Sequence, residues 1–226
     1  MAAAEKPPHK LKFAVLATDT VLFTFDKGLL KVLLMKVNRP PFFKNHWGAP
    51  GGLIHPKETA EQSAKRHIRA KGGIARVALT EQLYTFSRVN RDPRGRVVSV
   101  AYLALMPSTD MPAKLPNGVL WFSVKKLPRL AYDHAEVIAQ AIARLRAKLA
   151  YTNIAFALLP NEFTLGELQR LYETILGRKL DKRNFQKKFL QLQLIRKTGK
   201  KRHMGRSRPA ELWRFVEQKQ KEVEIL

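Results

Sequence analysis

The residues whose types and spacing most clearly indicate chemistry are the basic side chains between positions 178 and 208. This stretch holds thirteen Lys or Arg and a single acidic residue. A solvated surface usually mixes both signs of charge, so this density favours contact with a polyanion such as DNA. The whole chain points the same way, because its 42 basic and 18 acidic residues give a formal charge of +24.

A helix expected from about Asp181 to Leu192 carries part of this charge. Phe185 and Phe189 would pack inward, which leaves a basic and polar face suited to the major groove. Asn184 and Gln186 are the neutral side chains there that could pair with adenine. A following wing could hold phosphates or enter the minor groove. The predicted DNA-binding residues are Thr164, Lys182, Arg183, Asn184, Gln186, Lys187, Lys200, Lys201, Arg202, Arg206 and Arg208.

The elements that would position these residues form a winged helix-turn-helix. A short helix is expected near 153–158, and a second should begin after Thr164 and end at Gly177. After the third helix, strands near 195–198 and 211–215 complete the pattern. The change in pattern near residue 150 predicts two domains, 1–150 and 151–226.

The first 150 residues read as a mixture of strands and helices. Their expected elements are a hairpin over 13–37, a loop over 38–52, a helix over 58–71, strands over 82–88 and 97–106, and a helix over 133–150. Asp133 is a candidate N-cap for the last helix. The histidines form no metal-ligand spacing, and His134 is interpreted as a structural hydrogen-bonding residue.

Composition excludes several classes of protein. The chain has no cysteine, which rules out disulfides, thiolate zinc sites and cysteine nucleophiles. Its apolar content of 45% rules out wholesale disorder. The longest apolar stretch, residues 11–25, contains charged and hydroxyl side chains, so we expect no membrane span. The first ten residues lack a signal core, and the expected location is the cytoplasm.

Residues 52–74 resemble the signature of the Nudix hydrolases, Gly-x5-Glu-x7-Arg-Glu-U-x-Glu-Glu-x-Gly-U, in which U is aliphatic. Three acidic positions of that signature are instead His67, Ala70 and Lys71. The matching residues, all in register, are Gly52, Glu58, Arg66, Ile68, Gly73 and Ile74.

These replacements remove the chemistry that the signature implies. Carboxylates at positions 67, 70 and 71 would face one spot on a helix, hold Mg²⁺ and activate water. An imidazole, a methyl group and an ammonium group cannot, and Glu58 alone is not a magnesium site. Glu61 has the wrong helical phase to substitute. We therefore expect no metal, no cofactor and no catalytic residue; the residual hypothesis is that Lys71 pairs directly with a ligand pyrophosphate.

The chain as a whole resembles the Nudix-related transcriptional regulators of the NrtR family. The matching pieces, in order, are residues 82–86, 91–97, 133–136, 180–185 and 205–210. The resemblance implies an α+β architecture, with a Nudix fold of mixed sheet between helices followed by a winged helix. It further implies a homodimeric repressor of NAD-metabolism genes that binds double-stranded operator DNA and responds to ADP-ribose or a related nucleotide.

Candidate effector-binding residues lie around the degenerate Nudix cleft. Trp47 or Phe86 could stack on a base, or either could belong to the core. Arg88, Arg94 and Arg96 could bind phosphate. Arg94 and Arg96 could instead lie in an exposed hairpin turn, and this basic turn could also contact DNA or a partner subunit. Arg66 could assist Lys71 or simply pair with Glu58. The predicted set is Trp47, Gly52, Glu58, Arg66, Lys71, Phe86, Arg88, Arg94 and Arg96.

Two other functions remain open from the residues. The chain could be a nucleotide-sugar pyrophosphatase with rearranged metal ligands. It could also be a constitutive DNA-binding protein whose Nudix domain serves only dimerisation. If the chain is a ligand-responsive regulator, the helix expected over 133–150 is the element that would transmit a shift to the DNA-binding part.

Overall fold

The computed structural model describes residues 14–203 and 209–225. The predicted hairpin is present as β1 (Val15–Asp26) and β2 (Leu29–Arg39), which pair antiparallel. Lys27 and Gly28 turn the chain between them with φ angles of 50° and 78°. Gly28 suits this turn because it has no Cβ to oppose a positive φ.

The remaining elements of the larger unit extend this hairpin into a mixed sheet covered by helices. In chain order they are β3 (Phe43–Gly48), β4 (Gly51–Leu53), α1 (Ala60–Gly72), β5 (Leu79–Phe86), β6 (Val97–Leu105), η1 (Ser108–Asp110), β7 (Val119–Ser123) and α2 (His134–Tyr151). The strand order is β3-β2-β1-β6-β5, with β4 paired to β1 and β7 to β2. The sheet is mixed because β1 and β6 run parallel.

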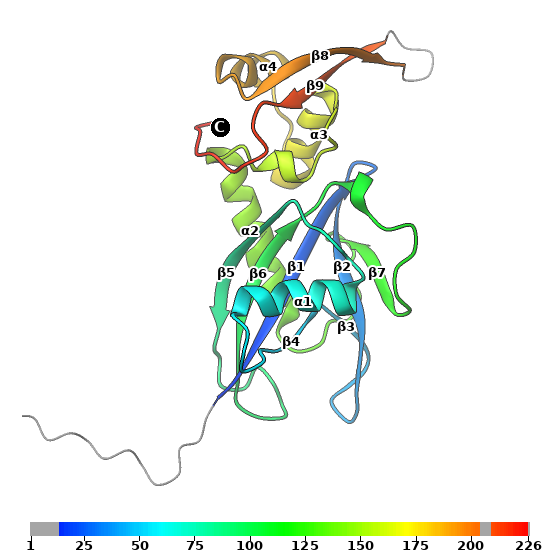
Figure 1. Cartoon of the computed structure of the whole chain (residues 1–226), viewed down its shortest axis with the longest axis vertical. Helices are drawn as coiled ribbons and strands as arrows, with labels where there is room; N and C mark the ends of the chain where they lie inside the picture. Colours follow the sequence, from blue (N-terminus) through cyan, green and yellow to red (C-terminus); the bar gives the residue numbers. More distant parts are fainter. Residues whose placement is uncertain (1–13, 204–208, 226) are drawn as a thin grey trace, which may run out of the picture.

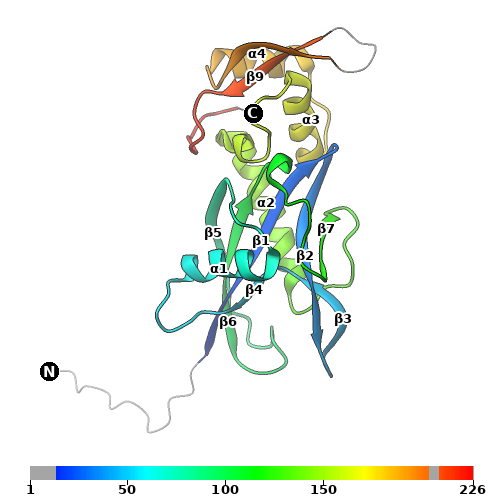
Figure 2. The same cartoon turned by 45° about the vertical axis from the view of Figure 1, so that its right-hand side comes forward.

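Helices α1 and α2 lie on opposite faces of this sheet (Figures 1 and 2). Strand alternation explains why both faces are apolar. Phe23 and Phe25 of β1 pack in the cluster beneath α2, whereas Leu22 packs with Ile68 of α1. The fold class predicted from the sequence, α+β with a mixed sheet between helices, is confirmed.

The structure corrects three features of the sequence analysis in this unit. The segment 38–52, predicted as a loop from its prolines and glycines, contains β3 and the start of β4. The short strand β7 was not predicted at all. Asp133 immediately precedes α2, yet its side chain caps nothing, because its carboxylate is occupied by an arginine described below.

The winged helix-turn-helix follows the order that the sequence predicted. Thr164 and Glu167 form a reciprocal capping box at the start of the second helix, and Gly177 ends that helix with a φ of 74°. The elements are η2 (Ile154–Ala157), α3 (Leu165–Leu176), α4 (Lys182–Gln191), β8 (Ile195–Arg202) and β9 (Ala210–Phe215). The first of them is a 3₁₀ turn rather than an α-helix.

The two units touch at more than one place. Helix α2 runs behind the sheet and ends at the winged helix (Figure 1). At the tip of the β1–β2 hairpin, the Thr174 hydroxyl of α3 donates to the carbonyl oxygen of Gly28 at 3.3 Å. Near the C-terminus, the Val223 N–H donates to the Tyr151 carbonyl at 2.9 Å. None of the helices within the described ranges is long and apolar enough to cross a bilayer.

Candidate functional site

A cavity of about 700 Å³ opens at the end of the sheet that lies away from the winged helix (Figure 1). The start of β1, the end of β2, strand β4, the end of α1 and the β5–β6 loop all contribute to its walls. Residues from the beginning of α2 close it on one side. The cavity therefore lies where the degenerate Nudix segment, residues 52–74, meets the loop rich in arginine.

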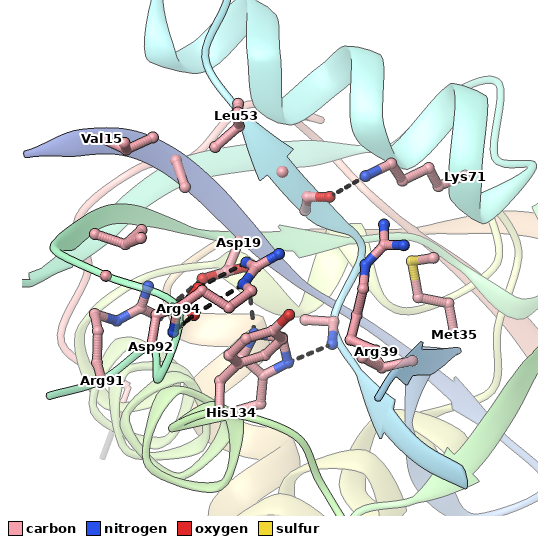
Figure 3. A pocket seen from close by; sticks show the side chains of 18 of the residues that line it. Val15, Asp19, Met35, Arg39, Leu53, Lys71, Arg91, Asp92, Arg94 and His134 are labelled. Carbon is pink, nitrogen blue, oxygen red and sulfur yellow. Dashed lines mark hydrogen bonds and ion pairs between the residues drawn. The ribbon is translucent and has the colours of Figure 1, made fainter. Parts of the chain in front are cut away.

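A buried network of charged side chains lies against this cavity (Figure 3). The Arg91 guanidinium donates to Asp133 from Nε at 2.8 Å and from a terminal nitrogen at 2.6 Å. The same terminal nitrogen donates to Asp19 at 3.1 Å. The Ser99 hydroxyl also donates to Asp19, at 2.7 Å. Arg91 thus joins a carboxylate of β1 to the carboxylate that precedes α2.

His134, the first residue of α2, completes the network. Its Nδ1 accepts a hydrogen bond from the backbone N–H of Ala49 at 3.0 Å, so the ring proton is on Nε2. Nε2 lies 3.3 Å from Asp19 and donates to it. Burial opposes ionisation of Asp19, but the interactions with His134, Ser99 and Arg91 outweigh it and hold its pKa well below the usual range. The interpretation of His134 as a structural hydrogen-bonding residue is confirmed.

The end of α1 tests whether a metal ion fits this site. Lys71 Nζ donates to the Gly51 carbonyl at 2.5 Å, and the buried His67 ring places Nε2 3.2 Å from the Leu53 carbonyl. Ala70 carries no ligand atom and is exposed. Nowhere in residues 14–203 and 209–225 do three His, Cys, Asp or Glu side chains gather as metal ligands. These residues do not fit Mg²⁺, which needs several oxygen ligands.

Glu58 and Arg66 face each other instead of the cavity. Arg66 Nε donates to the Glu58 carboxylate at 2.8 Å, and a second bond forms between a terminal nitrogen and the other oxygen. This bond from Arg66 is the main reason that the pKa of Glu58 lies well below its usual range. Their prediction as effector residues is not supported, because neither lines the cavity; the alternative interpretation as an ion pair is confirmed.

Three further predicted residues also lie outside the cavity. The Trp47 ring packs edge-on against Phe122 at 4.7 Å, and Phe86 is buried, so the core interpretation holds for both aromatic residues. Arg88 pairs with Glu136 on the surface. Apolar packing explains the positions of Trp47 and Phe86, and the Glu136 carboxylate explains that of Arg88. All three are therefore removed from the predicted effector-binding set.

The other predicted cavity residues are correctly placed. Gly52, Lys71, Arg94 and Arg96 all line the cavity. Arg94 is held by two bonds to Asp92, at 2.9 and 2.7 Å, and its guanidinium carbon lies 5.5 Å from the centre of the Tyr132 ring. Arg96 donates to backbone carbonyls of the β5–β6 loop. Arg94 is exposed in the turn before β6, so the exposed-turn interpretation is confirmed for it, and its guanidinium is also paired with Asp92 beside the cavity.

Sequence reasoning missed several cavity residues. Asp19, Arg91 and His134 are far apart in the sequence, and no local spacing joins them. Arg39 and Tyr132 also line the cavity. The only available signal was indirect, because residues 91–96 and 133–136 both belong to the segments that resemble the NrtR family.

The candidate nucleic-acid interface centres on α4. Arg183, Asn184 and Lys187 are exposed, while Phe185 and Phe189 are buried as predicted. Gln186 is half-buried and so lies nearer the packed side of the helix than expected. Lys182 is exposed in the first turn. The helix therefore presents a basic surface with two exposed amides, those of Asn184 and Gln191.

The wing differs more from expectation. Lys200 pairs with Glu162 at 2.9 Å, and Arg202 pairs with Glu167 at 2.8 Å, so both basic groups are engaged within the protein. Thr164 is buried and its hydroxyl accepts the N–H of Glu167, so it acts as a helix cap instead of a DNA contact. Lys201 is exposed. Arg206 and Arg208 lie outside the described residues.

The fold and the cavity define a Nudix domain joined to a winged helix, and comparisons with known proteins agree. The chain matches the NUDIX domain over residues 15–145 and the NrtR DNA-binding winged helix domain over residues 155–215. It is 33% identical over 208 residues to the ADPR responsive transcriptional repressor NtrR of Acinetobacter baylyi, covering 89% of this chain and 82% of that protein. The chain belongs to the NrtR family of Nudix-related regulators.

Solved structures support the same placement. The crystal structure of Shewanella oneidensis NrtR complexed with a 27mer DNA has a TM-score of 0.80 and 36% identity, covering 88% of this chain and 93% of that one. The NUDIX domain of the same protein complexed with ADP ribose has a TM-score of 0.52 and 36% identity, covering 62% and 93%. An ADP-ribose pyrophosphatase of Methanocaldococcus jannaschii is 31% identical over 109 residues, 48% of this chain and 63% of that protein.

Proposed function

We propose that this protein is a transcriptional repressor whose operator binding responds to ADP-ribose. The observation that carries the proposal is the path from the cavity to the winged helix. Asp133 and His134 meet the cavity network at the start of α2, and the other end of α2 meets the winged helix. The DNA and ADP-ribose bound to the Shewanella relative support both ligands.

The path is long enough to connect the two sites directly. Helix α2 has 18 residues, which corresponds to about 27 Å at 1.5 Å per residue. A ligand that alters the contacts of Arg91 or His134 would tilt or shift the start of this helix, and its other end would move with it. The ligand must bind the two arrangements with different affinity, because otherwise the DNA-binding equilibrium cannot change.

Hydrolysis is not part of the proposed function. The three positions where the Nudix signature carries carboxylates hold His67, Ala70 and Lys71, and the surviving Glu58 is occupied by Arg66. We therefore expect no hydrolysis of ADP-ribose to AMP and ribose 5-phosphate in the presence of Mg²⁺. Turnover that depends on Mg²⁺ and disappears in Glu58→Gln would favour the pyrophosphatase instead.

Within the cavity, we propose Tyr132 as the aromatic side chain that contacts the effector. It lines the cavity and is half-buried, and its ring lies 4.3 Å from that of Phe43. The other proposed effector-binding residues are those predicted from the sequence that line the cavity, namely Gly52, Lys71, Arg94 and Arg96. Tyr132→Ala should weaken ADP-ribose binding, whereas Trp47 packs against the core outside the cavity and its replacement should mainly reduce stability.

We also propose that the protein acts as a homodimer, with a domain boundary near residue 150. Two copies of α4 would then read two half-sites separated by one or two turns of DNA. Sedimentation of the full chain measures the oligomeric state, and the symmetry of the selected operator provides a second measure. A monomer bound to an asymmetric site would contradict this part of the proposal.

The main experiment follows operator release. A genomic fragment selected by the protein is labelled, and its fluorescence anisotropy is recorded with the full chain as ADP-ribose is added. We expect the complex to dissociate, with unrelated nucleotides such as GMP as controls. Unchanged DNA affinity at saturating ADP-ribose would refute the switch and leave a constitutive DNA-binding protein.

A further inference from the structure

The cavity carries more positive charge than its own acids can neutralise. Among the residues that the structure describes, two carboxylates line it, those of Asp19 and Asp92. Arg91 is already bonded to Asp19, and Arg94 to Asp92. The basic residues that line the cavity are Lys36, Arg39, Lys71, Arg91, Arg94 and Arg96. The excess favours an anionic ligand of at least two negative charges.

Two of these basic side chains lie close together without an acidic partner. Lys71 is half-buried at the end of α1, and Arg39 is exposed at the end of β2. Across the described residues, neither forms an ion pair with a carboxylate. Figure 3 shows the Arg39 guanidinium extending from β2 toward the Lys71 ammonium.

The surroundings of Lys71 are built for this ammonium group. Its Nζ donates one hydrogen bond to the Gly51 carbonyl, at 2.5 Å, and so has two hydrogens left to donate to a ligand. A Cβ on Gly52 would come within 2.8 Å of Nζ, so glycine is needed there for the lysine to approach β4. Burial lowers the pKa of Lys71, and the charge of Arg39 lowers it further, so a bound anion would relieve a real repulsion.

We propose that Lys71 and Arg39 together bind the pyrophosphate of the effector as fixed cations, so that binding requires no divalent metal ion. This inference rests on the proposed function for the identity of the effector. The metal that the Nudix signature implies does not fit the residues present, as the geometry of His67, Ala70 and Lys71 shows. A lysine supplies a point charge, and an arginine supplies a planar pair of donors that matches phosphate oxygens.

The first test is the metal dependence of binding. ADP-ribose is titrated into the full-length protein by calorimetry, once in EDTA and once in Mg²⁺. We expect the same dissociation constant within twofold. Binding that disappears in EDTA and returns with Mg²⁺ would overturn the proposal, because the two side chains would then be insufficient.

The second test removes each charge in EDTA. Lys71→Gln and Arg39→Gln should each weaken ADP-ribose binding about tenfold or more, the effect expected for a hydrogen bond to a charged group. Arg69→Gln is the matched control, because Arg69 is an exposed basic residue of the same helical turn that does not line the cavity. Circular dichroism and DNA binding without ligand confirm that each variant is folded.

Inorganic pyrophosphate separates this proposal from the proposed function. In EDTA it should raise the melting temperature of the wild type and of Arg69→Gln but not of Lys71→Gln. If ADP-ribose binds as described yet leaves DNA affinity unchanged, the switch fails and the two-cation site stands. If neither probe binds the wild type in EDTA, or if Lys71→Gln and Arg39→Gln bind as tightly as Arg69→Gln, the two-cation site is wrong.

Discussion

Replacing Arg91 with glutamine should greatly reduce the stability of the folded protein. The Arg91 side chain is only 4% exposed, and its guanidinium contacts both Asp19 and Asp133. Glutamine is uncharged and shorter, so it would leave two buried carboxylates without the positive charge between them. Removing one partner of a buried ion pair typically costs about 3–5 kcal/mol in the free energy of unfolding. Because His134 and Ser99 still donate to Asp19, the lower end of this range applies.

Urea denaturation at pH 7, followed by circular dichroism, measures the free energy of unfolding. The control is Arg88→Gln, since Arg88 pairs with Glu136 at the surface, where an ion pair contributes about 0–1 kcal/mol. The double variant Arg91→Gln with Asp133→Asn should lose less stability than the two single changes summed, because the second change removes a stranded charge. If Arg91→Gln is no more destabilising than Arg88→Gln, the reasoning about the buried network is wrong.

Three further predictions concern acid, capping and salt. The pKa of Asp19 is depressed in the folded state, so its ionisation stabilises the fold above about pH 4, the ordinary value for an aspartate, and this stabilisation is lost as the pH falls further. Urea midpoints measured from pH 7 to pH 3 should therefore fall less steeply for Asp19→Asn than for the wild type. Thr164→Ala removes the cap of α3 and should cost about 0.5–2 kcal/mol in thermal or urea denaturation; wild-type stability would contradict this. Lys187→Gln should reduce the slope of log DNA affinity against log salt by about 0.9 if the lysine contacts one phosphate; an unchanged slope would place Lys187 away from the DNA.

The helices and the central hairpin could be predicted because their signals are local. Thr164 caps the start of α3 with its side chain, and Gly177 ends the helix with a positive φ. Both effects depend only on residues within the helix and its ends. Strands β3 and β4 could not be recognised, since Pro40, Pro41 and Pro50 are typical of loops and pairing with β2 and β1 is decided by tertiary contacts. Local propensity carries no information about such partners.

The cavity was only partly predictable for a related reason. Lys71 and Gly52 fall within one signature, so their spacing alone brings them to the same place. Asp19 and Arg91 are 72 positions apart, and only the parallel pairing of β1 with β6 brings their surroundings together. Trp47 shows the opposite kind of error. It was predicted to contact the effector because it lies beside the Nudix signature in the sequence, but it packs against Phe122.

The apolar cluster described above also crosses from one unit into the other. Phe25 and Leu30 at the hairpin, Leu145 of α2, and Leu168 and Tyr172 of α3 all belong to the same buried cluster. A boundary near residue 150 would thus separate the Nudix fold from the winged helix along the chain, although both share one hydrophobic core. Neither unit can unfold without exposing apolar surface of the other, so calorimetry of the full chain should record one cooperative transition.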